Sequence, residues 1–348
     1  MAEKIRCAVI GLGMGRCHIA GYREHPDAEV VAVADTDAAK LAKFRDELNL
    51  PAVYTNPLEM IEKERPDVLS VAVPNKFHAG LAIAGLEAGC HVLCEKPMAM
   101  NAAEAETMLA AARRTGKRLG INFSFRFSPE AYAMKQIVDS GRIGEIYYAR
   151  SVWMRRRGMP GFGGWFGTRS LSGGGPLIDL GVHRLDLALW LMGYPEPEWV
   201  IGSVYDKIAA PIAKKSGKTF DVEDFACSFI RFRNGASLEL DTSWAGNIKE
   251  NELMQTRLLG DRGGLFHSNI GESYKFRLEC FEEIDSCQFD TELHPPVSAC
   301  HSSYCTFIDA IKNGVPFTVA PEEGVTVMRL LDAIYESART GAPVRIGA

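Results

Sequence analysis

The chain has 348 residues, of which 47% are hydrophobic and 24% are charged, and its formal net charge at pH 7 is −5. This is the composition of a globular protein, and its length favours two domains over one. The negative charge argues against nucleic acid or an anionic membrane as a partner, because both select strongly basic faces.

The sequence predicts a cytoplasmic protein. No apolar run reaches the roughly 18 residues that a membrane span needs. The first residues lead straight into a strand-like segment, so we expect no secretory signal. The nine cysteines are odd in number and scattered, which is typical of reduced thiols rather than of a disulfide framework.

The first third of the chain alternates short apolar runs with segments of helical periodicity. Continuous apolar strands separated by helices predict a parallel sheet buried on both faces. Pro57 behind Asn56 favours a helix start, and Gly89 and Gly116 are placed to end helices. The predicted strands are Ile5–Ile10, Val30–Ala34, Val68–Val73, His91–Cys94 and Arg118–Asn122, and the predicted helices are Ala38–Leu48, Pro57–Glu64, His78–Ala88 and Asn101–Thr115.

The pattern changes near Asn122, and we place a domain boundary between residues 123 and 124. Strand-like segments then come in series, which predicts an antiparallel sheet in an α+β domain. Asn234-Gly235 predicts a tight hairpin turn, and Lys207–Lys218 is expected to be a surface loop. The predicted strands are Glu145–Arg157, Trp199–Tyr205, Phe225–Phe232, Ala236–Trp244, Glu252–Leu259 and Tyr274–Phe281, and the predicted helices are Pro176–Met192, Ser302–Asn313 and Glu322–Thr340.

A glycine-rich segment directly follows the first predicted strand and opens a helix. Gly11, Gly13 and Gly15, with Met14 between the last two, let the chain turn tightly and let a pyrophosphate approach the backbone. The positive end of the helix attracts the phosphates. The third glycine comes one position earlier than in G-x-G-x-x-G, and a structural glycine turn is the alternative. The strand and helix around it predict a Rossmann dinucleotide-binding domain in residues 1–123.

Asp35 ends the second predicted strand, about twenty residues after the glycines. A carboxylate there accepts hydrogen bonds from ribose hydroxyls and repels a 2′-phosphate. Thr36 and Asp37 supply no cation to receive that phosphate, so NAD is expected and NADP is less favoured. The alternative is that Asp35 caps the following helix.

Lys96 follows the predicted strand His91–Cys94, within Glu95-Lys96-Pro97. Ligands of open α/β sheets bind at the carboxyl ends of strands, where a lysine can hold and polarise a substrate oxygen. The alternative is an ordinary surface lysine.

A second polar group lies on the helix predicted from Pro176. Asp179, His183 and Asp186 stand at i, i+4 and i+7 and would share one face among largely apolar neighbours. Polar groups on a buried helix are either satisfied by hydrogen bonds or functional. A histidine beside a carboxylate is a candidate general acid–base, and a structural hydrogen-bond network is the alternative.

Five segments together resemble one known family. They are GLGMGRCH at 11–18, VPNKFH at 73–78, HVLCEKPMA at 91–99, SGGGPLIDLGVHRLD at 172–186 and VMRLLDAIYESARTG at 327–341. The chain resembles the Gfo/Idh/MocA family, the glucose–fructose oxidoreductase and inositol dehydrogenase group, over nearly its whole length. The resemblance implies an N-terminal Rossmann domain and a C-terminal α+β domain, in residues 124–348, with a large, mostly antiparallel open sheet. That sheet commonly serves as an oligomer face, so a homodimer or homotetramer is expected.

The resemblance also implies roles for individual residues. His183 would remove the hydroxyl proton, Lys96 would bind the same oxygen, and Asp179 would orient the substrate or the histidine. The positions that contact the cofactor would be Gly11, Gly13, Met14, Gly15, Asp35, Pro74, Asn75, His78, Glu95 and Lys96.

The segment 153–166 combines aromatic residues, glycines and arginines. Flat aromatic rings suit sugar faces, and arginines suit hydroxyls or a carboxylate, so Trp165 and Arg156 are candidate substrate ligands. A strand with a solvated basic face and a covering loop is the alternative. Arg126 and Arg169 are further candidates. His294, Cys300, His301 and Cys305 lack the spacing of a zinc site, so no metal is expected.

The sequence therefore predicts an NAD-dependent oxidoreductase that transfers a hydride between nicotinamide and a sugar, sugar derivative or cyclitol. The substrate is a small molecule and not a nucleic acid or membrane. Two alternatives use the same fold: a redox-neutral glycosidase that employs bound NAD, and a non-catalytic NAD-binding regulator. The complete set of Lys96, Asp179 and His183 argues against the regulator, which has no need for proton transfer.

Overall fold

The computed structural model describes residues 4–294 and 302–347, which form two compact units. Unit 1 comprises Met1–Phe123 and His301–Met328, and unit 2 comprises Ser124–Cys300 and Arg329–Ala348. The sequence analysis assigned every residue after 123 to the second domain. The segment from 301 to 328 instead belongs to unit 1, because its helix α10 (Ser303–Asn313) packs against α1 (Gly15–Glu24).

Unit 1 is built on a six-stranded parallel sheet with the order β3-β2-β1-β4-β5-β6. This is the doubly wound order that binds dinucleotides where the strand order reverses. The predicted strands are confirmed within two residues at each end, and the short β3 was missed. The strands are β1 (Ile5–Ile10), β2 (Ala28–Ala34), β3 (Val53–Tyr54), β4 (Val68–Val71), β5 (His91–Cys94) and β6 (Leu119–Ile121).

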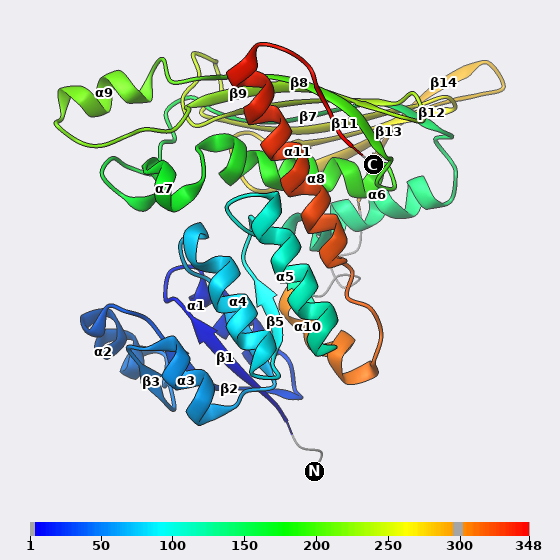
Figure 1. Ribbon diagram of the computed structural model, residues 1–348. Coiled ribbons are helices and arrows are strands. Elements are labelled where there is room, and N and C mark those ends of the chain that lie inside the picture. The colour runs from blue at the N-terminus through cyan, green and yellow to red at the C-terminus, as the bar shows by residue number, and fades with distance from the viewer. Residues whose placement is uncertain (1–3, 295–301, 348) are drawn as a thin grey trace. The chain divides into compact units, whose positions relative to one another are not determined.

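The helices of unit 1 begin and end as their capping residues predict. Asn56 accepts hydrogen bonds from the backbone at the start of α3, and Gly116 ends α5 in the left-handed conformation with φ of 67°. Beside α1 and α10, the helices are α2 (Ala38–Glu47), α3 (Pro57–Glu64), α4 (His78–Glu87) and α5 (Ala102–Thr115), and η1 (Asn75–Phe77) is a short 3₁₀ turn (Figure 1).

Unit 2 contains a nine-stranded sheet with the order β14-β13-β12-β11-β7-β10-β9-β8-β15. The pair β7–β10 is parallel and the other neighbouring pairs are antiparallel, which confirms a mostly antiparallel sheet. The strands are β7 (Ile146–Arg155), β8 (Pro197–Tyr205), β9 (Phe225–Phe232), β10 (Ser237–Ser243), β11 (Glu252–Gly260), β12 (Gly263–Asn269), β13 (Phe276–Ile284), β14 (Cys287–Leu293) and β15 (Val344–Arg345).

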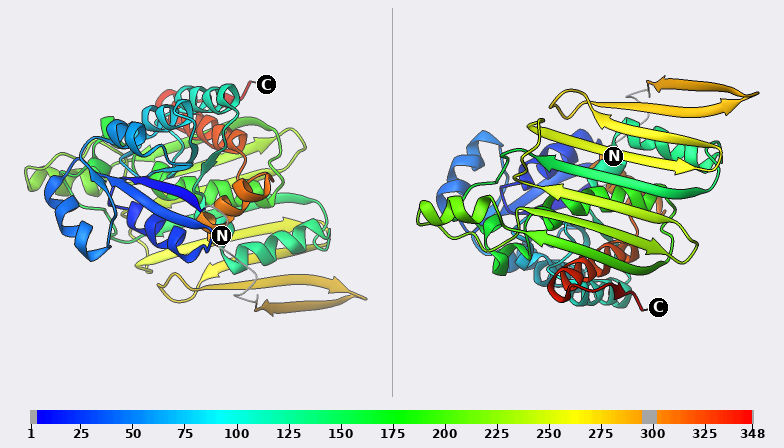
Figure 2. Two further views of the ribbon diagram at one scale, coloured as in Figure 1. Left: turned by 90° about the horizontal axis from the view of Figure 1, so that it is seen from below. Right: turned by 90° about the horizontal axis from the view of Figure 1, so that it is seen from above.

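One face of this sheet carries helices, and no helix of the described residues covers the other, which is called the open face, as the right view of Figure 2 shows. Helices α6 (Pro129–Asp139) and α8 (Val182–Leu191) lie on the covered face, with the second half of α11 (Pro321–Thr340). Alternate residues of each strand point to the open face. Among them are Tyr148, Val152, Trp199, Ile201, Tyr205, Phe225, Phe229, Leu253, Phe266 and Phe281.

Several elements of unit 2, among them α6, β12, β14 and β15, were not predicted, and two predicted segments take a different form. The helix expected over Pro176–Met192 begins as a π turn, Leu177–Gly181, before α8. The expected loop at Lys207–Lys218 contains a short helix, α9 (Ala209–Lys215), in which Ala209 and Ala213 are buried. Oδ2 of Asp224 accepts hydrogen bonds from the N–H groups of Ile208 and Ala209 at the start of this helix, each at 2.6 Å.

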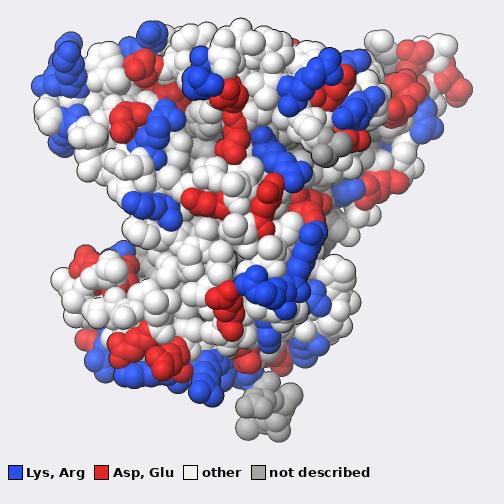
Figure 3. Space-filling model, in the orientation of Figure 1, with Lys and Arg blue, Asp and Glu red and all other residues white. Residues whose placement is uncertain are grey.

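The surface carries both signs of charge. On the face drawn in Figure 3, lysine and arginine side chains are interspersed with aspartate and glutamate in both units. Within residues 4–294 and 302–347, no helix combines the length and apolar character needed to cross a membrane.

Candidate active site

The three glycines after β1 serve three different physical purposes. Gly11 has φ of +93°, and a Cβ there would lie 2.2 Å from the carbonyl oxygen of Ala72. A Cβ on Gly15 would lie 2.8 Å from Cγ1 of Val9, so this glycine permits close packing of helix on strand. A Cβ on Gly13 would meet nothing within 4 Å. The shortened motif therefore retains a turning glycine, an open glycine and a packing glycine.

This arrangement fits a dinucleotide pyrophosphate. Gly13 presents bare backbone to open space, and Met14 beside it is 55% exposed. No side chain among the described residues caps the N-terminus of α1. The first N–H groups of that helix are thus available to phosphate oxygens.

Asp35 lies at the end of β2, beside the glycine loop. Its Oδ2 accepts hydrogen bonds from the backbone N–H of Leu12 at 2.7 Å and from Nζ of Lys40 at 2.9 Å. Burial alone would raise the pKa of Asp35, but Lys40 and the backbone donors outweigh it and hold the pKa below its ordinary value. The residue that caps α2 is Asp37, so the capping alternative for Asp35 is wrong. Lys40 is a cation that the sequence analysis did not weigh.

Asn75 and His78 follow β4. Asn75 opens η1 and is buried, with Pro74 before it. The ring nitrogens of His78 lie 2.8 Å from the carbonyl oxygens of Pro97 and Val73, and burial lowers the pKa of its imidazole. His78 therefore ties the loop after β4 to the loop after β5. Its contact with the cofactor stays a prediction.

Glu95 and Lys96 follow β5, and Glu95 is held in a buried network. Its Oε1 lies 2.8 Å from Nε2 of His18 and accepts a hydrogen bond from Nδ2 of Asn122 at 2.6 Å. Burial alone would raise the pKa of Glu95, but these two partners hold it below its ordinary value. Lys96 itself is partly exposed. No sequence pattern singled out His18 or Asn122 for this role.

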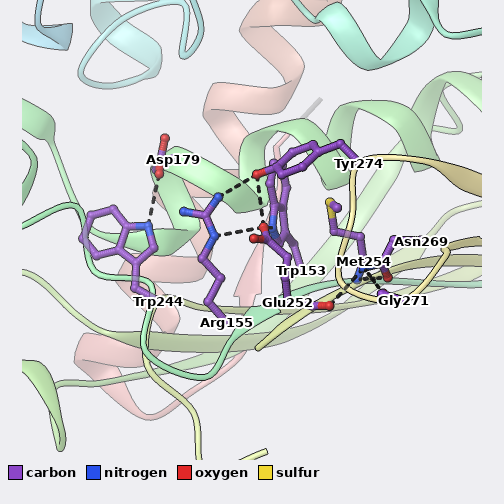
Figure 4. Close-up of polar contacts among 9 residues, drawn as sticks. All are labelled: Trp153, Arg155, Asp179, Trp244, Glu252, Met254, Asn269, Gly271 and Tyr274. Atoms are coloured by element: carbon purple, nitrogen blue, oxygen red, sulfur yellow. Dashed lines mark hydrogen bonds and ion pairs between the residues drawn. The ribbon is translucent and has the colours of Figure 1, made fainter. Parts of the chain in front are cut away.

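Asp179 lies in the π turn of unit 2. Its Oδ2 accepts a hydrogen bond from Nε1 of Trp244 at 3.1 Å (Figure 4), and Trp244 is fully buried at the end of β10. π turns occur frequently at functional sites. Because of the π turn, the regular spacing of Asp179, His183 and Asp186 on one α-helix is not retained, and Asp186 pairs elsewhere.

His183 lies one turn further along and is 9% exposed. Its ring packs edge-on against Phe125, with 5.1 Å between ring centroids, and lies 5.8 Å from the ring of Trp153. The imidazole thus has aromatic walls on two sides, and these fix the plane of the ring.

A buried carboxylate organises the glycines before the π turn. Oε1 of Glu223 accepts hydrogen bonds from the N–H of Gly175 at 2.8 Å, from the N–H of Leu177 at 3.2 Å and from the hydroxyl of Tyr335 at 2.8 Å. A Cβ on Gly174 would lie 1.9 Å from that hydroxyl. Packing therefore requires glycine at 174 and at 175, where a Cβ would lie 2.0 Å from the carbonyl oxygen of Glu223, and Gly173 has a positive φ of 84°. No sequence pattern connected Glu223 or Tyr335 with these glycines.

A polar cluster lies beside Trp153, on the face of the sheet to which Trp153 points (Figure 4). Oε1 of Glu252 accepts hydrogen bonds from Nε1 of Trp153 at 2.7 Å, from Nε of Arg155 at 3.0 Å and from the hydroxyl of Tyr274 at 3.1 Å. Nη2 of Arg155 donates to that hydroxyl at 2.9 Å. Nη1 has no hydrogen-bond partner among residues 4–294 and 302–347, and the side chain is 20% exposed.

The other arginines named from the sequence lie in different surroundings. Arg126 is buried in a pair with Asp186, with Nε 2.9 Å from Oδ2. Arg156 is exposed just beyond β7. Arg169 lies 3.7 Å from Oε2 of Glu223. Trp165 stacks on Phe166 with 3.8 Å between ring centroids.

The sequence analysis expected no metal site, and the structure describes part of the residues considered for one. No group of three or more histidine, cysteine, aspartate or glutamate residues among 4–294 and 302–347 is arranged to hold a metal ion. Cys300 and His301, two of the four residues considered for zinc, lie outside the described residues.

Two family models match the chain. Residues 5–123 match the NAD-binding Rossmann fold of an oxidoreductase family, and residues 135–346 match the C-terminal α/β domain of the same family. The chain belongs to the Gfo/Idh/MocA oxidoreductase family. The resemblance inferred from the sequence motifs and the predicted fold class are thereby confirmed.

Several Gfo/Idh/MocA relatives match over their full length. D-glucoside 3-dehydrogenase of Escherichia coli is 34% identical, over 99% of this chain and 98% of the relative. Myo-inositol 2-dehydrogenase of Thermotoga maritima is 27% identical, over 98% of each chain. GenD2 from gentamicin A biosynthesis, solved with NAD, is 25% identical with a TM-score of 0.83, over 100% of this chain and 98% of its own.

The curated relatives above are named as dehydrogenases, and a further relative, 1,5-anhydro-D-fructose reductase of Ensifer adhaerens, is named as a reductase. This member of the Gfo/Idh/MocA family is accordingly an NAD(P)-dependent dehydrogenase or reductase that acts on CH–OH groups.

Proposed function

We propose that this chain is an NAD-dependent sugar dehydrogenase in which Lys96, Asp179 and His183 handle the substrate. The observation that carries this proposal is the placement in unit 2 of a partly exposed carboxylate, Asp179, in the π turn that leads directly into the helix of His183. Aromatic side chains fix both: the indole N–H of Trp244 fixes Asp179, and two rings enclose His183.

Each of the three side chains has a distinct task. His183 takes the proton of the substrate hydroxyl as general base, and returns it in the direction of reduction. Lys96 holds the same oxygen and stabilises negative charge on it. Asp179 orients the substrate or the imidazole. The nicotinamide, when bound, supplies the hydride acceptor.

The preference for NAD rests on the ionised Asp35. A carboxylate at the end of β2 accepts hydrogen bonds from ribose hydroxyls and repels a 2′-phosphate. Lys40 offsets part of that repulsion, because its ammonium lies 2.9 Å from the carboxylate. We therefore propose a moderate rather than an absolute preference for NAD.

The substrate that we propose is a sugar or glycoside, and a D-glucoside is the first candidate because of the relationship to D-glucoside 3-dehydrogenase. Cyclitols are the second, because of the inositol dehydrogenases. Arg156 and Trp165 remain proposed substrate ligands, and Arg155 joins them because it lies on the same face of β7 as Trp153. Arg126 is not retained as a ligand, because its side chain is fully buried against Asp186. We also propose that the protein works in the cytoplasm as a homodimer or homotetramer.

The test is oxidation of a panel of methyl glucosides, aldoses, cyclitols and sugar acids with NAD, followed by the absorbance of reduced nicotinamide. Turnover of an uncharged sugar or cyclitol that requires His183 would support the proposal. Glycoside cleavage without net production of NADH would indicate the redox-neutral glycosidase instead. NADH binding without turnover of any compound would indicate a regulator.

A further inference from the structure

A buried chain of hydrogen bonds runs through unit 1 and reaches the residue before Lys96. The ring of His18, on α1, is fully buried. Its Nδ1 lies 2.8 Å from Oγ of Ser70 on β4, and its Nε2 lies 2.8 Å from Oε1 of Glu95. The hydroxyl of Tyr22 lies 2.6 Å from the same Ser70 oxygen. One imidazole thus joins α1, β4 and the end of β5.

The far side of Glu95 is fixed as well. Asn122 donates to its Oε1 at 2.6 Å, and Oδ1 of Asn122 accepts a hydrogen bond from Ser303 at 2.7 Å. The Glu95 carboxylate therefore has partners on two sides, and loss of His18 would leave this buried carboxylate held from one side only.

Lys96 lies between two residues that are held by side chains from other elements. Glu95 precedes it and is held by His18 and Asn122. Pro97 follows it, and its carbonyl oxygen lies 2.8 Å from Nδ1 of His78. The backbone on both sides of Lys96 is thus fixed by side chains from other elements, and this fixes the point from which the lysine side chain extends.

His18 also lies on α1, the helix that begins just after Gly13, the glycine with open space beside it. Gly15 begins α1, and His18 comes at the end of its first turn. A shift of that turn would move the imidazole and, through it, the Glu95 carboxylate. The hydrogen bond between His18 and Glu95 therefore connects the predicted phosphate-binding turn to the residue beside Lys96.

We propose that His18 is a positioning residue that acts through Glu95 to fix Lys96 relative to the phosphate-binding turn of α1. This inference rests on the proposed function for the catalytic role of Lys96. The placement of Lys96 can be measured without turnover, so the two can be tested separately.

The variants are His18→Leu, which removes both hydrogen bonds, and His18→Gln, which keeps a donor toward Glu95. Glu95→Gln removes the charge that His18 holds. His25 provides the matched control: it directly follows α1, it is buried, and its Nε2 contacts Asp309 at 3.1 Å rather than Glu95. His25→Leu therefore deletes a buried histidine of the same unit that has no contact with Glu95.

The first readout is the rate at which acetic anhydride acetylates Lys96 in the full-length protein, relative to Lys76, measured by peptide mass spectrometry. His18→Leu and Glu95→Gln should change this ratio at least about threefold. His18→Gln should restore most of it, and His25→Leu should leave it unchanged. An unchanged ratio in folded His18→Leu and Glu95→Gln would overturn the proposal. If His18→Leu does not fold, an unchanged ratio in Glu95→Gln overturns it alone.

The second readout is kcat for the best sugar of the panel, in wild-type and Lys96→Met backgrounds. His18→Leu should lower kcat about tenfold or more in the wild type, with little change in KM for NAD, and should cause no further loss beside Lys96→Met. Equal losses in both backgrounds would contradict action through Lys96. Near-normal kcat in Lys96→Met would instead refute the proposed function, and the acetylation ratio would still decide the role of His18.

Discussion

Nζ of Lys40 lies 2.9 Å from Oδ2 of Asp35, so the carboxylate predicted to select NAD is paired with a cation on the next helix. The two side chains oppose each other in the choice of cofactor. Asp35 disfavours a 2′-phosphate, and Lys40 would attract one. The balance between these two charges predicts how substitutions at Asp35 and Lys40 change the selectivity for NAD over NADP.

Asp35→Ala should narrow the difference between the dissociation constants of NADH and NADPH by about tenfold, which corresponds to about 1.4 kcal/mol. Lys40→Ala should widen the difference, because the offsetting cation is removed. Nicotinamide fluorescence measures both, and Lys43→Ala on the same helix is the control. Tighter binding of NADPH than of NADH by the wild type would contradict the proposal that NAD is the preferred cofactor.

Trp244→Phe should lower kcat/KM by about 10- to 100-fold while NADH affinity is retained. The substitution removes the indole N–H that donates to Asp179, and a hydrogen bond to a charged group contributes about 1.5–3 kcal/mol. A phenyl ring keeps the contacts with Phe166 and Phe220. Trp199→Phe, on the open face of the sheet, is the control and should leave kcat/KM unchanged. Equal kinetics in both variants would show that the indole does not position Asp179.

Arg155→Met should raise KM for the sugar about tenfold or more, and Arg156→Met should raise it less. Arg155 lies on the same face of β7 as Trp153 and keeps one amino group without a partner among the described residues, whereas Arg156 is exposed beyond the strand. Steady-state kinetics at saturating NAD measure both. A larger rise in KM from Arg156→Met than from Arg155→Met would show that Arg156, the arginine named from the sequence, is the stronger substrate ligand.

The fold of unit 1 followed from the sequence because its signals are local. Continuous apolar strands such as Ile5–Ile10 are bounded by glycine, proline and capping asparagine, and each signal acts within a few residues. The strand β14 was missed although Cys287, Phe289 and Leu293 alternate with polar residues. Nearly all of its residues are exposed, and its place at the edge of the sheet is set by pairing with β13.

The site was predicted in part. Lys96, Asp179 and His183 carry recognisable motifs, but the residues that hold them come from distant segments. Glu223 lies 48 positions from the Gly175 that it binds, and His18 lies 77 positions from Glu95. The π turn at Asp179 was missed because helical periodicity was assumed throughout the segment. Contacts of this kind are set by tertiary packing, which a single sequence does not display.

Phe229→Glu should reduce the oligomeric state measured by light scattering. Phe229 lies on the open face of the sheet against Trp199, with 5.7 Å between ring centroids, and next to it Ile201 is 42% exposed. An apolar face of this extent is expected to be covered by another subunit. Tyr132→Glu, at an exposed position of α6, is the control. A wild-type protein that is monomeric at micromolar concentration would contradict the proposed oligomer.

The central claim is that His183 and Lys96 act on one substrate oxygen during hydride transfer. The most direct measurement is the pre-steady-state rate of NAD reduction at saturating sugar for His183→Ala, Lys96→Ala and the double variant. Each single variant should lose at least about 100-fold, the lower end of what general-base catalysis supplies, while NAD still binds. The double variant should lose less than the sum of the single losses in free energy, because both groups serve the same oxygen. Near-normal rates in both single variants would contradict the account.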